Sequence, residues 1–226
     1  MKRLFVRLAV ALLASWSLAS SNVVLLRSAT GWAAALKTDA ASVGWTDSDP
    51  ALKSDAGTAQ AALTAAEKQA ILSAHNNARK AVPGNTGGPL PVMTWDDRLA
   101  AAAQKWANTL AGRCNGSQDH SGTNYGENLF SSWTSDATAS PAPATRAISF
   151  WVGEKQYYTY SKTKCPAGSV CGRCSKFPCT HYTQIVWRTT TKVGCARATC
   201  KAPGKYWTIW VCNYDPPGNI AGQPPY

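Results

Sequence analysis

Eight cysteines follow a basic and then apolar N-terminus, and this combination limits what the chain can fold into more than any other feature. Residues 1–19 begin with Lys2, Arg3 and Arg7 and continue as an apolar run over residues 8–18. That run is about half the length that crosses a bilayer, so it is typical of a signal peptide rather than a membrane anchor. We therefore predict export to an oxidising compartment, where the cysteines pair as disulfides.

The sequence divides into three parts. We assign residues 1–34 to the signal peptide, with cleavage after Ala19 or after a later small residue such as Ala33. Residues 35–63 are rich in Ala, Ser, Asp and Thr without sustained apolar periodicity, and we interpret them as a flexible spacer. Residues 64–226 form the predicted folded domain, with a Pro- and Gly-rich tail, and no further stretch approaches membrane-spanning length.

Lys and Arg outnumber Asp and Glu by 23 to 12, which gives a formal net charge of +11. This excess favours solubility, and weak attraction to acidic cell walls or anionic membrane surfaces is the alternative. The basic residues are scattered and the predicted compartment is extracellular, so we expect no nucleic-acid partner. Composition indicates no particular oligomeric state.

Two helices are expected at the start of the domain. Thr64 and Glu67 fit a capping box, in which each side chain satisfies a free backbone N–H of the first turn. This first helix should end near Pro83, and the second should follow Trp95. The faces that helical spacing predicts are Ile71, Ala74, His75 and Ala78 in the first helix and Leu99, Ala103, Trp106 and Leu110 in the second.

The rest of the domain changes character after a Gly-, Ser- and Asn-rich loop. A third helix is expected from about Thr145. Its expected members include Phe150, Trp151, Glu154 and Tyr158. Residues 181–188, 193–199 and 206–213 are rich in Val, Ile, Tyr, Trp and Thr, which favours antiparallel strands. Early helices followed by late strands indicate an α+β domain with helices packed on a sheet.

The chain has three histidines. His75 lies on the apolar face of the first helix, so we interpret it as a hydrogen-bonded core residue. His120 and His181, together with Glu127 and Glu154, could form a divalent metal site or an acid–base pair. Their wide spacing gives little support to either idea by itself.

Four cysteines cluster shortly before His181: Cys165, Cys171, Cys174 and Cys179. The Cys-x-x-Cys spacing of Cys171 and Cys174 resembles a zinc site. We favour disulfides, because extracellular thiols pair with each other before they meet zinc. Eight cysteines allow 105 pairings, and spacing alone does not select one. Each bridge should contribute on the order of 2–4 kcal/mol to stability.

Four ordered motifs resemble those of the CAP family, which comprises cysteine-rich secretory, antigen 5 and pathogenesis-related class 1 proteins. The motifs are HNNAR at 75–79, GENL at 126–129, THYTQIVW at 180–187 and IWVCNYDPPGNI at 209–220. Thr180 replaces the family's usual Gly, and Trp210 replaces a smaller apolar residue. The resemblance is greatest to the plant pathogenesis-related class 1 branch.

This resemblance implies a three-layer α-β-α sandwich with a central antiparallel sheet, braced by disulfides. It also implies a cavity lined by two histidines and two glutamates. By motif position, these correspond to His120, His181, Glu127 and Glu154. The two histidines hold zinc in some relatives, so a divalent metal such as Zn²⁺ is the cofactor that the resemblance suggests.

The resemblance also suggests that Cys114 pairs with Cys200 and Cys195 with Cys212. The other four cysteines exceed the usual plant set, so their pairing stays open. The segment 161–178 is interpreted as an insertion.

Two covalent modifications are candidates. Plant members of the family can release a short defence-signalling peptide, and the equivalent cut here falls between Asp215 and Pro216. The alternative is that residues 216–226 simply pack on the sheet. Asn115, in the sequence Asn-Gly-Ser, is a glycosylation candidate in a eukaryotic source.

Three functions follow from these observations. The first is a secreted, defence-related or antimicrobial protein that binds sterols or other lipids, with a microbial membrane or cell wall as the surface it meets; the resemblance supplies this ligand class. The second is a metal-assisted hydrolase in which Glu127 or Glu154 acts as base, which is less favoured because no nucleophile motif is present. The third is a precursor of the peptide 216–226.

Overall fold

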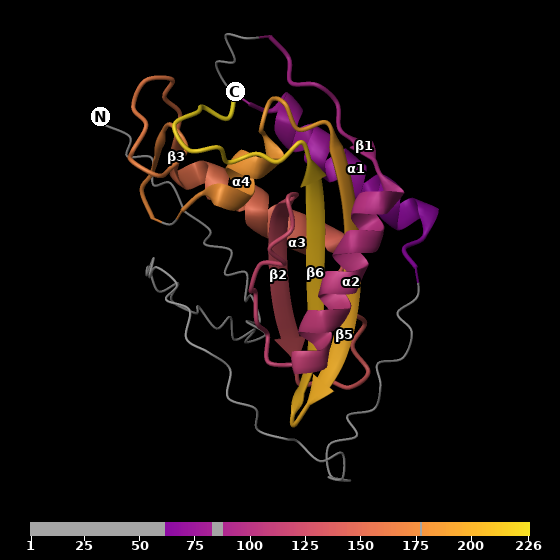
Figure 1. The fold of residues 1–226 in the computed structure, drawn as a ribbon. Helices are drawn as coiled ribbons and strands as arrows, with labels where there is room; N and C mark the ends of the chain where they lie inside the picture. The colour runs from indigo at the N-terminus through magenta and orange to yellow at the C-terminus, as the bar shows by residue number, and fades with distance from the viewer. Residues whose placement is uncertain (1–61, 83–87, 177) are drawn as a thin grey trace, which may run out of the picture. The chain divides into compact units, whose positions relative to one another are not determined.

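The computed structural model describes residues 62–82, 88–176 and 178–226. The predicted signal peptide and nearly all of the predicted spacer lie outside these residues. The described chain forms, in order, α1 (Ala65–Lys80), β1 (Thr94–Trp95), α2 (Asp97–Arg113), β2 (Gly126–Thr134), α3 (Ala144–Gly153), the 3-10 helix η2 (Glu154–Tyr157), β3 (Tyr158–Thr159), β4 (Arg173–Cys174), α4 (Thr180–Ile185), β5 (Lys192–Ala202) and β6 (Lys205–Asp215) (Figure 1). None of the described helices is long and apolar enough to cross a membrane.

The main sheet has the strand order β1-β5-β6-β2. The long strands β5 and β6 form an antiparallel hairpin, and β2 pairs antiparallel with the other edge of β6. The expected antiparallel centre is therefore present, and the short β1 adds a parallel partner to β5, which makes the sheet mixed. β3 and β4 pair with each other in a small second sheet.

Helices cover both faces of the main sheet. Successive side chains of a strand point to opposite faces, and β6 follows this rule. Ile209 and Val211 pack with the apolar side of α2, whereas Trp210, Cys212 and Tyr214 pack with the core that α1, α3 and α4 share. Figure 1 shows α2 on one side of the strands and α3 on the other. The predicted α-β-α sandwich is confirmed.

The first two helices begin where the sequence predicts. The Oγ1 of Thr64 accepts a hydrogen bond from the backbone N–H of Glu67, and Oε2 of Glu67 accepts one from the backbone N–H of Thr64, so the capping box is present. α1 ends at Lys80, slightly before the predicted end. α2 is capped by the carboxylate of Asp96, which accepts from the backbone N–H groups of Arg98 and Leu99.

The strand predicted over residues 181–188 is wrong, because residues 180–185 form α4. Its aromatic and β-branched composition favours a strand, but four consecutive side chains, those of residues 182–185, are buried. A strand in one face of a sheet buries alternate residues, whereas a short helix wedged between other elements can bury several in a row. Thr183 donates from Oγ1 to the carbonyl of Cys179, four residues earlier, as a helical hydroxyl does.

Two other boundaries also differ from the prediction. The third helix ends at Gly153, so Glu154 begins η2 and Tyr158 lies in β3. The Gly-, Ser- and Asn-rich loop ends at Tyr125, because the unpredicted strand β2 starts at Gly126. Gly126 lets the buried side chain of Gln184 approach the strand closely, because a Cβ would lie 2.2 Å from its Oε1.

All eight cysteines form disulfides, and none is free. The pairs are Cys114–Cys200, Cys195–Cys212, Cys165–Cys171 and Cys174–Cys179. The first two are those that the family resemblance suggested. The last two close short loops within the segment 161–179, which leaves no thiolate there for a zinc site.

Candidate functional site

The first histidine–glutamate pair joins the loop after α2 to the start of β2. Nδ1 of His120 lies 2.8 Å from Oε1 of Glu127, and the backbone N–H of Ser121 donates to the same oxygen over 2.9 Å. The side chain of Glu127 is 4% exposed, whereas that of His120 is 66% exposed. The carboxylate is therefore inside the protein and the imidazole is largely outside.

Hydrogen bonds keep this carboxylate ionised. Burial alone would raise the pKa of Glu127, but the hydrogen bonds from His120 and Ser121 outweigh it and lower the pKa below its ordinary value. An ionised carboxylate only accepts, so we assign the proton of the imidazole to Nδ1. The second carboxylate oxygen, Oε2, is buried without a hydrogen-bond partner in the described part of the chain.

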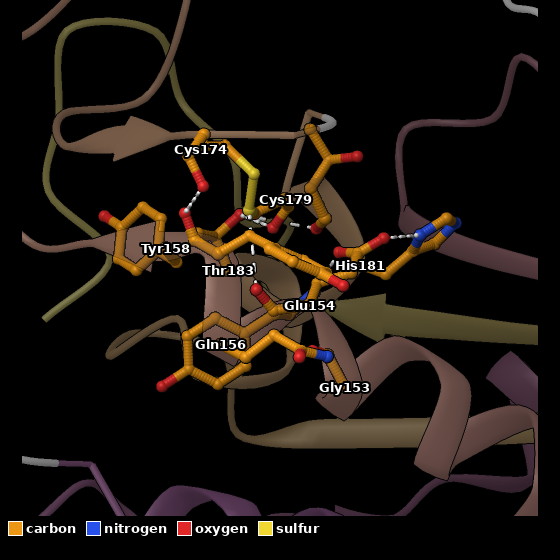
Figure 2. Close-up of a disulfide and its surroundings, with 12 residues drawn as sticks. Gly153, Glu154, Gln156, Tyr158, Cys174, Cys179, His181 and Thr183 are labelled. Carbon is orange, nitrogen blue, oxygen red and sulfur yellow. Dashed lines mark hydrogen bonds and ion pairs between the residues drawn. A yellow bond between two sulfur atoms is a disulfide. The ribbon is translucent and has the colours of Figure 1, made fainter.

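The second pair joins η2 to α4. Nδ1 of His181 lies 2.7 Å from Oε1 of Glu154, and the backbone N–H of Tyr182 donates to Oε2 over 3.0 Å. The indole of Trp151 stacks on the imidazole with 6.0 Å between the ring centroids. Figure 2 shows this pair beside the disulfide that Cys179 forms immediately before α4.

The two pairs share one hydrogen-bonding pattern. In each, Nδ1 faces a carboxylate, and among the described residues no hydrogen bond engages Nε2 of His120 or His181. Histidines that bind metals commonly have this arrangement, in which the carboxylate fixes the ring and leaves Nε2 for the ion. Imidazole nitrogen also suits zinc and similar divalent ions.

The described residues supply few other ligands. No group of three or more His, Cys, Asp or Glu side chains in residues 62–82, 88–176 and 178–226 is placed to hold a metal ion. Two imidazole nitrogens would leave the other positions of an ion open to water or to a ligand. Such a donor set does not fit a closed structural zinc site, which takes four protein ligands.

Asn128 connects the two pairs. It follows Glu127 in β2, and its Nδ2 donates to the carbonyl of His181 over 3.1 Å and to the hydroxyl of Tyr214 over 3.2 Å. That hydroxyl lies 2.9 Å from Nε2 of His75. The matched sequence motifs thus meet at one buried set of hydrogen bonds. The sequence analysis missed Asn128 and Tyr214, although both lie inside matched motifs.

His75 is the core residue that the sequence predicted. It is fully buried, and its Nδ1 lies 2.8 Å from the carbonyl of Ile71. A carbonyl only accepts, so Nδ1 holds the proton and Nε2 accepts from Tyr214. Burial lowers the pKa of His75 to about 4, with a smaller effect from the positive charge of Arg79. The ring is therefore neutral at physiological pH.

Arg79, in the same motif, supports the C-terminal end of α4. Its guanidinium donates to the carbonyls of Pro91, Ile185 and Trp187 at 2.8–2.9 Å. The motif at 75–79 therefore positions α4, and with it His181, without contributing a ligand.

The C-terminal tail packs on α4 and on the segment 161–178 rather than on the sheet. The backbone N–H groups of Arg188 and Cys171 donate to the carbonyls of Pro225 and Gln223 over 2.7 and 2.9 Å. The ring of Tyr226 is buried and stacks on Tyr160. The candidate cleavage point between Asp215 and Pro216 lies at the end of β6, and release of residues 216–226 stays a prediction.

Comparisons with known proteins identify relatives of this chain. Residues 72–214 match the CAP cysteine-rich secretory protein family. Pathogenesis-related protein 1C of Nicotiana tabacum is 45% identical over 159 residues, which cover 70% of this chain and 80% of the relative. Pathogenesis-related protein PRMS of Zea mays is 44% identical over 158 residues, covering 70% and 81%.

Two solved structures share the fold. The structure of BmVAL-1 superposes with a TM-score of 0.55 at 24% identity and covers 73% of this chain and 83% of its own. The structure of NaASP2 with Zn²⁺ gives a TM-score of 0.54 at 26% identity, covering 72% and 86%. At least one structural neighbour has therefore been solved with a divalent metal. The sequence match and the fold agree, and the chain belongs to the CAP cysteine-rich secretory protein family.

Proposed function

We propose that this chain is a secreted, defence-related protein that binds a divalent cation such as Zn²⁺ through His120 and His181. The observation that carries the proposal is the shared geometry of the two pairs, in which each imidazole is held at Nδ1 and open at Nε2. Defence is supported by the plant pathogenesis-related relatives. Export is supported by the four disulfides, which form and persist in oxidising compartments.

Each residue has a distinct part in this proposal. His120 and His181 would supply the two nitrogen ligands, and Glu127 and Glu154 would hold the rings in the binding tautomer. Trp151 restricts the ring of His181 by stacking on it. When bound, a divalent ion with open positions can attract an anionic group of a ligand. Because protons compete for the same imidazole nitrogens, affinity should fall on acidification.

Calorimetric titration of the chelator-treated protein with ZnCl₂ tests the proposal. We expect one ion per chain in the wild type and a loss of at least about tenfold in affinity for His120→Ala or His181→Ala. Glu127→Gln and Glu154→Gln should weaken binding less. Glu67→Gln is the matched control, because Glu67 also pairs through hydrogen bonds but lies at the start of α1. Equal affinity in the wild type and in the His120→Ala/His181→Ala double variant would contradict the proposal.

Sterol or lipid binding is a second proposal, and one surface feature favours it. Phe150 of α3 is 52% exposed and contacts Phe130, with 5.7 Å between the ring centroids. It lies four residues before Glu154, in the helix that leads to the second pair. Saturable uptake of a fluorescent sterol should weaken in Phe150→Ser and stay unchanged in Val92→Ser, another exposed apolar position. No saturable uptake by the wild type would remove this proposal.

A further inference from the structure

The turn after α2 presents the chain's one Asn-x-Ser/Thr sequence on the surface, beside an aromatic cluster. Asn115 is exposed, and its Oδ1 accepts a hydrogen bond from the backbone N–H of Ser117 over 2.9 Å. This orients the amide so that Nδ2, the atom that glycosylation modifies, has no hydrogen-bond partner among the described residues. The side chain is thus fixed at its oxygen and free at its nitrogen.

An indole lies directly under this turn. Gly116 has a φ of +74°, and a Cβ on it would lie 2.3 Å from the ring of Trp207, so the backbone of the turn rests on the indole. Trp133 lies opposite Trp207 in the β2–β6 pairing, and Nζ of Lys205 lies 4.9 and 5.8 Å from the two ring centroids. Both indoles are half-buried, so each retains some exposed surface.

The neighbouring disulfide holds the turn against the same strand. Cys114, which precedes Asn115, is bonded to Cys200, and Cys200 lies opposite Trp207 in the β5–β6 pairing. The two cysteines are 86 residues apart, so during synthesis Asn115 is exposed well before Cys200 is available to close the bridge. The folded structure therefore does not obstruct an early modification.

We propose that Asn115 receives an N-linked glycan whose first N-acetylhexosamine lies against Trp207. In the reaction, Nδ2 of Asn115 forms a bond to C1 of a lipid-linked oligosaccharide diphosphate. The C1–O bond to the diphosphate breaks, the diphosphate leaves with that electron pair, and Nδ2 loses one proton. The inference rests on the export in the proposed function, because the donor is found in the secretory pathway.

Intact mass measurement of protein secreted by a eukaryotic host tests the modification. We expect one glycan, removed by peptide-N-glycosidase, absent from Asn115→Gln and Ser117→Ala and retained in Ser117→Thr. The Ser117 variants keep the test decisive should Asn115→Gln fold poorly. Secreted, fully disulfide-bonded wild type without a glycan overturns the inference and leaves the proposed export intact. Protein retained inside the cell with free thiols overturns both.

Proton NMR of the glycoprotein tests the contact. An N-acetyl methyl group over an indole should resonate upfield of its free position, and that shift should disappear in Trp207→Leu and persist in Trp95→Leu. A methyl resonance at the free position in the wild type overturns the contact with Trp207.

Discussion

Each histidine–glutamate pair joins Nδ1 of the imidazole to a carboxylate, but the two pairs differ in the structure that holds them. His120 and Glu127 are 7 residues apart and meet at the edge strand β2, with most of the imidazole in solvent. Glu154 and His181 are 27 residues apart, and the side chain of His181 is only 24% exposed. The first pair is a local feature of one loop and strand, whereas the second depends on the packing of α3, η2 and α4. A ligand should therefore be able to reorient His120 more readily than His181.

Replacing the glutamate of each pair by alanine should give the largest difference in stability between the two pairs. Glu154→Ala leaves the buried N–H of Tyr182 and Nδ1 of His181 without an acceptor, so we expect a loss of about 3–4 kcal/mol in the free energy of unfolding. Glu127→Ala should cost about 1 kcal/mol, because the exposed His120 can turn to water. Urea unfolding measures both, and equal losses would show that the second pair is no more integral to the fold than the first.

Acid should affect the interior network through His75. The unfolded residue takes up a proton below its ordinary pKa of 6.5, whereas the folded one resists until about 4. Protonation of His75 in the unfolded chain alone therefore lowers the free energy of unfolding below pH 6.5. The loss reaches about 3 kcal/mol as the pH falls to 4. His75→Phe should be less stable at neutral pH but should lose much less stability over this interval.

The comparison that measures this effect is the difference in unfolding free energy between wild type and variant from pH 7.5 to 4. His75 is linked through Tyr214 and Asn128 to the carbonyl of His181. Identical pH profiles for the wild type and His75→Phe would show that the buried imidazole does not set the acid response.

Removing the Cys174–Cys179 disulfide should lower stability modestly and should also change the environment of the His181 imidazole. Cys174→Ser/Cys179→Ser opens a loop of sequence separation 5 and should cost about 2 kcal/mol. Cys165→Ser/Cys171→Ser, with separation 6, is a matched control of similar expected cost. Only the first variant should shift the imidazole resonances of His181. A similar shift in the control would mean that the whole 161–179 segment, rather than one bridge, positions this ring.

Truncating the histidines themselves should give the smallest losses. His181→Ala removes the stacking on Trp151 and should cost about 1–2 kcal/mol, whereas His120→Ala should stay within about 0.5 kcal/mol of the wild type. Thermal unfolding of the two variants in the presence of chelator measures this difference. A larger loss of stability for His120→Ala than for His181→Ala would show that the first pair contributes more to the fold than the second.

The elements that the sequence predicts correctly are those with strong local signals. The capping box of Thr64 and Glu67 and the apolar spacing of α2 depend on neighbouring residues alone, so they are visible in the sequence. The two pairs are not, because no periodicity relates Glu154 to His181. Only the family motifs assigned their four residues, and the structure then showed which glutamate faces which histidine.

Tertiary packing accounts for the wrong predictions. Residues 180–185 have a strand-like composition, yet they form α4 because Arg79, Glu154 and Asn128 satisfy backbone groups in and just after it from other elements. The start of β2 is hidden for a similar reason, since its Gly, Glu and Asn are poor strand formers that serve the site. Secondary-structure prediction from local propensity was wrong in the segments whose conformation depends on contacts within the candidate site.

Nitrogen-15 NMR of the histidine side chains during titration with Zn²⁺ tests most directly whether the two pairs form one site. We predict that the Nε2 resonances of His120 and His181 change together and reach completion at one equivalent, while those of His75 stay unchanged. A change at only one of the two histidines, or changes at different zinc concentrations, would contradict a shared site.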